Sequence, residues 1–255
     1  MATQGAPAGW QEDFRSIGGA KKNVGIIFVH GFTGAPASMR PWANWFSDQG
    51  YTVSVPRLPG HATQWQDLNK VSWREWPAKV DAELVWLRSS AVNCEKVFIF
   101  GLSMGGCTTL NVAERSRVDG IVLVNPMIHI ADPKIHIAPL LALVQKGRAS
   151  VGDDIKKPGV TEWGYDVLPT KGVVQLNKML NATRKALSAQ LAPTLLFHSV
   201  DDHVLPVTNT EIIMAGLGAS DKVRFELHDS YHVATLDNDQ QIIFDESLTF
   251  VKRLS

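Results

Sequence analysis

The chain has 255 residues, of which 45% are hydrophobic and 20% are charged, and its 25 basic residues balance 25 acidic residues. This length suits one large α/β domain or two small ones, and the absence of a Pro-, Gly- or Ser-rich linker favours one. The zero net charge gives no reason to expect a nucleic acid as a partner. Two cysteines, Cys94 and Cys107, are too few for a disulfide framework, and neither has neighbours with metal-ligand spacing.

The N-terminal residues 1–9 are small and polar, without a basic region followed by an apolar run. No stretch of the sequence approaches the roughly 20 apolar residues that a membrane span needs. We therefore expect a soluble chain that is not exported and is located in the cytoplasm.

Predicted strands and helices alternate along the sequence. The first half contains a short strand at 14–17, a strand at 24–29, a helix at 38–49, a strand at 51–56 and a helix at 72–89. The second half continues with strands at 97–100, 120–125, 194–198 and 223–228 and a closing helix at 240–254. Solidly apolar strands that alternate with helices predict a mainly parallel sheet, wound on both sides by helices.

One connection, after residue 125, is much longer than the about 10–12 residues that a crossover needs. It contains two apolar groups separated by a polar stretch, and a helix over 172–190 leads back to the sheet. An insertion after a strand end lies over the edge where such sheets bind ligands. We therefore predict a core of residues 1–126 and 170–255 and a small inserted cap of residues 127–169, which we call the cap segment.

The run Gly101-Leu102-Ser103-Met104-Gly105 matches the pattern G-x-S-x-G between a predicted strand and a predicted helix. This context gives the motif its meaning, because a serine at a sharp strand-to-helix turn has its Oγ exposed. Flanking glycines let neighbouring backbone pack close to the turn, and the helix N-terminus favours developing negative charge. A simple Gly-Ser turn or helix cap would leave the doubled glycine at 105 and 106 unexplained. We predict that Ser103 is a nucleophile.

A serine nucleophile needs a base within hydrogen-bond reach and a group that orients this base. The order along the chain is then serine, acid and histidine, each in a loop at the carboxyl end of a strand. His232 follows the last predicted strand and precedes the last helix, so we predict that it is the base. His198 and His228 fall within predicted strands and are interpreted as structural, and His203 as a neighbour of the acid.

Two adjacent acids, Asp201 and Asp202, follow the predicted strand 194–198 and qualify equally as the orienting carboxylate. Only one of them can accept the Nδ1 proton of His232, where it would fix the tautomer and stabilise the imidazolium. Asp229 is a weaker candidate because it lies too near His232 in the sequence.

Attack on a carbonyl creates an oxyanion, which two preorganised N–H groups stabilise by several kcal/mol. The backbone of Met104, directly after the nucleophile, is one predicted donor. The run His30-Gly31-Phe32-Thr33-Gly34 follows the strand 24–29, and we predict that the backbone N–H of Phe32 is the other. A phosphate-binding loop is the alternative, but the run lacks the lysine of a P-loop and the spacing of a dinucleotide fingerprint.

Five motifs occur in order along the chain: His30-Gly31-Phe32-Thr33-Gly34, Leu58-Pro59-Gly60-His61, Gly101-Leu102-Ser103-Met104-Gly105-Gly106, Asp202-His203-Val204-Leu205-Pro206 and Ser230-Tyr231-His232-Val233-Ala234-Thr235-Leu236-Asp237. Together they resemble α/β-hydrolases and, more narrowly, the bacterial monoacylglycerol lipase and carboxylesterase family. The resemblance implies an α/β-hydrolase fold with a small cap over the active site. It also implies that Asp202 is the acid, and it supports Phe32 and Met104 as oxyanion donors.

In the family that the sequence resembles, the cap carries a glutamate that holds the glycerol end of the substrate. Glu162, in the run Val160-Thr161-Glu162-Trp163-Gly164, resembles this residue. The alternative interpretation is an ordinary exposed surface glutamate. If the resemblance holds at this position, Glu162 is a substrate-binding residue of the cap segment.

Two classes of function follow from these motifs. The first is a serine ester hydrolase that needs no cofactor or metal and cleaves monoacylglycerols or, alternatively, general carboxylic esters. Its partners would be a small ester substrate and, through the apolar stretch 135–144 of the cap segment, transient contacts with lipid aggregates. The second is a non-catalytic small-molecule receptor with the same fold, since a fold alone does not fix function. The sequence leaves acyl length, alcohol and oligomeric state open.

Overall fold

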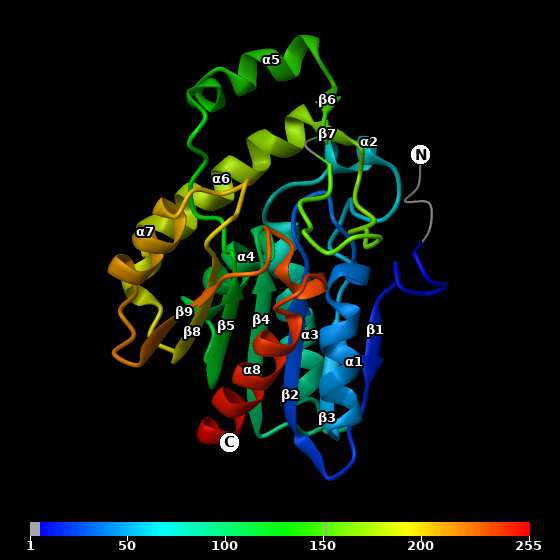
Figure 1. The fold of residues 1–255 in the computed structure, drawn as a ribbon, viewed down its shortest axis with the longest axis vertical. Helices are drawn as coiled ribbons and strands as arrows, with labels where there is room; N and C mark the ends of the chain where they lie inside the picture. Colours follow the sequence, from blue (N-terminus) through cyan, green and yellow to red (C-terminus); the bar gives the residue numbers. More distant parts are fainter. Residues whose placement is uncertain (1–5, 151) are drawn as a thin grey trace.

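A seven-stranded sheet crosses the middle of the computed structural model, which describes residues 6–150 and 152–255 (Figure 1). Its spatial order is β1-β3-β2-β4-β5-β8-β9, and only β1 runs antiparallel to its neighbour. The strands are β1 (Phe14–Ser16), β2 (Lys21–Val29), β3 (Tyr51–Val55), β4 (Lys96–Leu102), β5 (Gly120–Val124), β8 (Thr194–Ser199) and β9 (Lys222–Leu227). The predicted mainly parallel sheet is therefore confirmed.

Helices cover both faces of this sheet, as the alternation of patterns predicts (Figure 1). They are α1 (Arg40–Asp48), α2 (Trp65–Leu68), α3 (Glu75–Arg88), α4 (Met104–Ala113), α5 (Ala138–Val144), α6 (Thr170–Ala186), α7 (Thr208–Gly216) and α8 (Gln240–Leu254). Short 3-10 helices are η1 (Pro36–Ser38), η2 (Pro133–His136), η3 (Leu187–Ala189) and η4 (Ala234–Leu236). Neither α2 nor α7 was expected from the sequence, because both are short and show little apolar periodicity.

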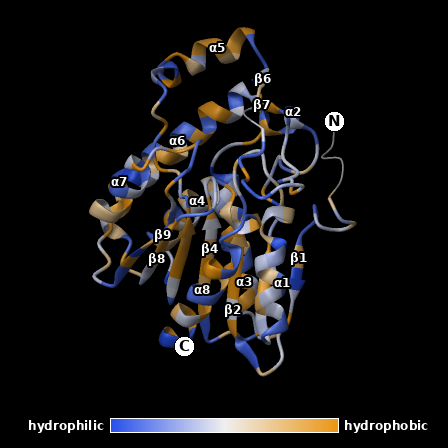
Figure 2. Cartoon of the chain, viewed as in Figure 1, coloured by the Kyte–Doolittle hydropathy of each residue, from blue (hydrophilic) through white to orange (hydrophobic). Residues whose placement is uncertain are grey.

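The apolar strands separate two hydrophobic clusters, one on each face of the sheet. Alternate residues of β2 illustrate this division, since Ile26 and Phe28 belong to one cluster and Ile27 and Val29 to the other. The first cluster is completed by side chains of α1 and α8, the second by α3, α4, α6 and α7. Figure 2 shows the central strands mainly in the hydrophobic colour. Burial of both faces explains why these strands read as unbroken apolar runs.

The register of the central strands determines which loops meet. Val29, at the end of β2, lies opposite Gly101 of β4, and Leu102 of β4 lies opposite Val124 of β5. The loop after β2 and the turn after β4 therefore leave the same edge of the sheet side by side. The loops after β8 and β9 reach this edge as well, because these strands are parallel to β5 and to each other.

The cap segment lies beyond this edge (Figure 1). It contains η2, α5 and an antiparallel pair, β6 (Gly147–Ala149) and β7 (Val167–Pro169), and α6 follows it. The apolar residues of α5 are divided between a buried side and an outer side, on which Leu140, Leu143 and Val144 are 67%, 79% and 85% exposed. Figure 2 shows this apolar helix at the rim of the molecule.

Two further expectations concern His228 and the N-terminal stretch. His228 is not part of a strand, because β9 ends at Leu227, and its side chain is exposed and not a buried structural histidine. The stretch 1–9, which we interpreted as lacking an export signal, lies partly outside the described residues. In the described ranges, no helix combines the length and the apolar character that would let it cross a membrane.

Candidate active site

Ser103 occupies a strained turn between β4 and α4. Its φ and ψ are 55° and −118°, in a region that residues other than glycine rarely adopt. The flanking glycines are required by close backbone contacts. A Cβ atom at Gly101 would lie 2.4 Å from the carbonyl oxygen of Gly105, and one at Gly105 would lie 2.0 Å from that of Val29. The G-x-S-x-G pattern is therefore a packing requirement of this turn.

Replacing Gly105 with alanine is expected to lower the free energy of unfolding by about 1–3 kcal/mol, because the added methyl group overlaps the backbone of β2. Chemical denaturation of the two proteins measures the difference. Gly19→Ala is the matched control, since no atom lies within 4 Å of a Cβ placed there. Equal stabilities of the two variants would contradict the packing argument.

The structure brings Ser103, His232 and Asp202 together from three different loops. The Nε2 atom of His232 lies 2.9 Å from the Oγ of Ser103, and its Nδ1 atom lies 2.8 Å from Oδ2 of Asp202. Both His232 and Ser103 are 7% exposed. An Nδ1–H that donates to the carboxylate leaves Nε2 free to accept the serine proton.

Local hydrogen bonds distinguish the two adjacent acids that the sequence left equivalent. Oδ1 of Asp202 accepts the backbone N–H groups of Val204 and Leu205, each at 2.8 Å, which aims Oδ2 at the imidazole. The side chain of Asp201 is 54% exposed and lies 3.9 Å from the Nζ of Lys156. Asp229 also pairs with Lys156, at 2.9 Å. Neither of these two acids contacts the imidazole.

The pKa of His232 is raised above the ordinary histidine value of 6.5. Burial acts against the charged form, but the charge and hydrogen bond of Asp202 and the charges of Glu162 and Asp154 more than offset it. This environment stabilises an imidazolium at the position where a general base would become protonated.

Three other histidines, His30, His198 and His203, are held in structural contacts. His203 has Nδ1 at 2.8 Å from Asp154, and His198 has Nδ1 at 3.3 Å from the hydroxyl of Thr210. His30 is fully buried, donates from Nδ1 to the carbonyl of Gly31 and accepts the N–H of Leu58 at Nε2. Burial lowers the pKa of His30 to about 4, which keeps it neutral. His30 therefore fixes the loop after β2.

That loop approaches Ser103 closely. A Cβ atom at Gly31 would lie 3.4 Å from the Cβ of Ser103 and 3.9 Å from its Oγ. Phe32 follows Gly31 and packs its ring against Trp76, with the ring centroids 6.0 Å apart. Met104, on the other side, is fully buried and begins α4. The two predicted oxyanion donors thus belong to backbone segments that border the nucleophile from β2 and β4.

Two supporting side chains were missed by the sequence analysis. Asn125, directly after β5, donates from Nδ2 to the carbonyls of Tyr231 and His232 and accepts the N–H of Ser199 at Oδ1. It therefore joins the ends of β5 and β8 to the loop of His232. Asp237 is fully buried and accepts the N–H of Tyr231. The carboxylate of Asp237 also binds two backbone N–H groups of the cap segment, at positions 156 and 157.

Asp154 connects the cap segment to the same loop. Its Oδ2 accepts the backbone N–H groups of His232 and His203, at 3.1 Å and 3.2 Å, while Oδ1 faces the ring of His203. Because Asp154 and His232 are 78 positions apart, no local pattern in the sequence could reveal this contact. The carboxylates of Asp154 and Asp237 together tie residues 154–157 of the cap segment to the loop that carries His232.

Ser103 and His232 face an open cavity between the sheet edge and the cap segment. Its lining includes the acidic side chains of Asp154 and Glu162, which we call the polar wall, and a group of apolar side chains, which we call the apolar wall: Met127, Ile130, Leu168, Val173 and Leu176. Within the described ranges, no cluster of three or more His, Cys, Asp or Glu side chains has the arrangement of a metal site. The lining of the cavity thus combines an apolar wall and a polar wall with one serine.

Glu162 lies in this cavity wall and is only partly exposed. Gly34 makes room for its carboxylate, since a Cβ there would lie 2.8 Å from Oε1 of Glu162. Burial raises the pKa of Glu162 to about 7, although the charge of His232 acts in the opposite direction. Glu162 is therefore not an ordinary exposed surface glutamate, which was the alternative interpretation of the sequence.

The model of the alpha/beta hydrolase family matches residues 26–245. The chain is 39% identical to a thermostable monoacylglycerol lipase of Bacillus sp. (strain H-257) over 89% of this chain and 90% of that protein. It is 23% identical to a carboxylesterase of Bacillus subtilis (strain 168), with coverage of 90% and 92%.

A solved structure from work on LipS and LipT, two metagenome-derived lipolytic enzymes, superposes with a TM-score of 0.90 and 34% identity, and covers 96% of this chain and 98% of that one. The family match extends over most of the sheet and includes the turn of Ser103 and the loops of Asp202 and His232. The chain belongs to the alpha/beta hydrolase family.

Proposed function

We propose that this protein hydrolyses carboxylic esters through an acyl-enzyme on Ser103 and that its preferred substrates are monoacylglycerols. The observation that supports this most directly is the hydrogen-bonded chain from Ser103 through His232 to Asp202, which opens into the cavity. The relatives named as a monoacylglycerol lipase and a carboxylesterase support the choice of an ester over other acyl compounds.

In the first half of the reaction, Nε2 of His232 takes the proton of Ser103 while Oγ attacks the ester carbonyl. The electron pair of the carbonyl double bond moves to the carbonyl oxygen, and the backbone N–H groups of Phe32 and Met104 stabilise this oxyanion. The tetrahedral intermediate then breaks its bond to the alcohol oxygen. His232 gives this oxygen its proton, so the alcohol leaves neutral and the acyl group stays on Ser103.

The second half repeats these steps with water as the nucleophile. His232 takes a proton from the water, whose oxygen attacks the acyl carbon, and the oxyanion forms at the same two N–H groups. The bond to Oγ then breaks, and His232 returns the proton to Ser103. Asp202 stays ionised throughout, holds the tautomer and stabilises the imidazolium at each stage.

The two walls of the cavity suit the two ends of a monoacylglycerol. The apolar wall accommodates an acyl chain, and Glu162 accepts hydrogen bonds from glycerol hydroxyls on the polar wall. A second acyl chain on this glycerol would lie against the acidic side chains of Asp154 and Glu162, which disfavours a diacylglycerol. The proposed substrate-binding role of Glu162 is what separates a monoacylglycerol lipase from a general carboxylesterase.

Glu162→Ala is expected to lower kcat/KM for monoacylglycerols by roughly five- to a hundredfold, because a substrate hydroxyl left unpaired in a closed pocket costs about 1–3 kcal/mol. Esters of p-nitrophenol carry no such hydroxyls and should be hydrolysed almost as before. Asp166→Ala removes an exposed acid from the same cap segment and serves as the control. Equal losses on both ester types would mean that Glu162 supports the cap structure and does not recognise the alcohol.

The pH dependence of kcat/KM should follow the protonation of His232. Because the imidazole must be neutral to accept the serine proton, activity should rise with pH through one ionisation above 6.5 and be lost as pH falls through it. Initial rates with a p-nitrophenyl ester between about pH 5 and 9 measure this profile. Glu162→Gln should move the midpoint down, since the charge of Glu162 raises the pKa of His232. A flat profile would contradict the role of His232 as the base.

The cap segment, residues 127–169, is part of the same proposal. Its apolar helix α5 exposes Leu140, Leu143 and Val144 to solvent, and Ile137 directly before the helix is exposed as well, at 48–85%. An exposed apolar helix beside a cavity for an acyl chain favours transient contact with lipid aggregates, from which single substrate molecules enter. The core of residues 1–126 and 170–255 would then provide the catalytic groups, and the cap segment the substrate contacts.

A further inference from the structure

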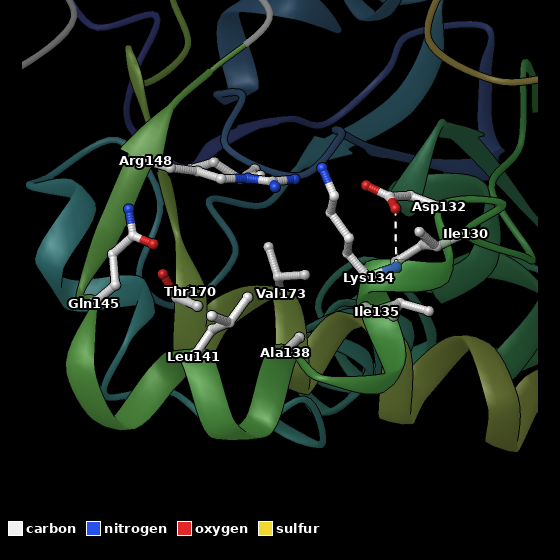
Figure 3. Close-up of a pocket in the computed structure, with 11 residues that line it drawn as sticks. Ile130, Asp132, Lys134, Ile135, Ala138, Leu141, Gln145, Arg148, Thr170 and Val173 are labelled. Atoms are coloured by element: carbon white, nitrogen blue, oxygen red, sulfur yellow. Dashed lines mark hydrogen bonds between the residues drawn. The ribbon is translucent and has the colours of Figure 1, made fainter.

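A second cavity, which we call the α5 cavity, lies beneath α5 and adjoins the cavity of Ser103. Ile130, Leu168, Val173 and Arg148 line both cavities and form their common wall. The rest of the α5 cavity includes apolar side chains from η2 and α5, such as Ile135 and Leu141 (Figure 3). An acyl chain that leaves Ser103 along the apolar wall therefore points towards this second cavity.

Two cations face this cavity without an acid between them. In Figure 3 the side chains of Arg148 and Lys134 point towards one another along one side of the cavity. Neither has an acidic ion-pair partner in the part of the chain that the structure describes. Asp132 also lines the cavity and adds one negative charge beside Lys134, whose backbone N–H its carboxylate accepts at 2.9 Å. Lys134 and Arg148 are both exposed, and together with Asp132 they leave a net positive charge at this place, which favours the binding of an anion.

Acidic side chains outnumber basic ones in the cavity of Ser103, whereas basic side chains outnumber acidic ones in the α5 cavity. Arg148 is the one lysine or arginine side chain among the described residues that line it, whereas Asp154 and Glu162 both contribute carboxylates. Ester hydrolysis turns a neutral substrate into a carboxylate at this place. The new anion is therefore repelled by the polar wall and attracted towards Arg148 on the common wall.

We propose that the α5 cavity is a binding and exit site for the fatty-acid product, with the acyl chain among its apolar residues and the carboxylate between Arg148 and Lys134. This inference rests on the proposed function, which supplies the carboxylate. The product leaves with its tail first through the α5 cavity, while the alcohol leaves past Glu162. The two products of one reaction thus separate by charge.

Calorimetric binding to the Ser103→Ala variant tests the site without turnover. The probes are decanoate and decan-1-ol, which have the same chain length and differ in charge. Decanoate should bind several-fold more tightly at low ionic strength, and the difference should shrink as salt is added. Equal affinities of the two probes would overturn the proposal.

Lys134→Gln identifies the cavity, because Lys134 lines the α5 cavity and not the cavity of Ser103. In the Ser103→Ala background it should weaken decanoate binding about three- to tenfold and leave decan-1-ol unchanged. Lys146→Gln removes the same charge from an exposed position of the cap segment outside both cavities and should change neither affinity. An equal effect of the two lysine variants, or no effect of Lys134→Gln, would overturn the assignment.

Ester hydrolysis by the unmodified protein is measured separately. Loss of decanoate binding in Lys134→Gln, together with product inhibition by decanoate that weakens in the same variant, supports the exit site. If the unmodified protein hydrolysed no ester but decanoate still bound between the two cations, the proposed function would be wrong while the anionic lipid site remained.

Discussion

Ser103→Ala should lower ester hydrolysis by about four orders of magnitude or more, while the protein stays folded. The reason is geometric, since the Oγ of Ser103 is the hydroxyl that lies 2.9 Å from Nε2 of His232 and opens into the cavity. Without it, the remaining groups can still bind the ester and stabilise an oxyanion, but no acyl-enzyme forms.

Steady-state rates with a p-nitrophenyl ester measure this effect, and thermal unfolding confirms that the variant is folded. Ser116→Ala is a suitable control, because Ser116 follows the far end of α4 and lies outside the cavity of Ser103. A Ser103→Ala protein that kept a tenth of the original turnover would show that another group is the nucleophile.

Asp202→Asn should reduce kcat by roughly three to four orders of magnitude, whereas Asp201→Asn should be nearly normal. An asparagine at 202 can keep its oxygen on the N–H groups of Val204 and Leu205, and it then presents its NH₂ group to Nδ1 of His232. Nδ1 must accept this hydrogen bond, so the neutral ring carries its proton on Nε2 and cannot take the proton of the serine.

The adjacent acid is the internal control for this experiment. Asp201 is 54% exposed, and Lys156, 3.9 Å away, is its ion-pair partner. Its neutralisation removes one surface charge and no contact with the imidazole. Should the two asparagine variants show the reverse order of activity, Asp201 would have to be the orienting acid.

The sequence predicted the parts of the fold that depend on local pattern. The strands buried on both faces appear as unbroken apolar runs in the sequence. The helix predicted at 240–254 has the same bounds as α8 in the structure. The turn at Ser103 could also be predicted, because the glycines at 101 and 105 are demanded by contacts within the motif and with the adjacent strand. These features are encoded over a few residues.

The features that could not be predicted depend on contacts between distant parts of the chain. The choice between two adjacent acids follows from the turn that aims Oδ2 of Asp202 at His232, and strand position alone does not determine it. Asn125 was read as the end of a strand, yet its side chain holds a loop more than a hundred residues away. The role of Asp154 depends on the contact between the cap segment and the loop of His232. This contact could not be predicted, because the short elements of the cap segment have no strong periodicity.

The most direct test of the proposed function is the rate of fatty-acid release from mono-, di- and tridecanoylglycerol, measured side by side at matched concentration. We predict rapid release from monodecanoylglycerol and much slower release from the other two, because their additional acyl chains would have to lie against the acidic side chains of Asp154 and Glu162. Release of no acid from any of the three would contradict ester hydrolysis of acylglycerols, and equal release from all three would contradict the monoacylglycerol preference.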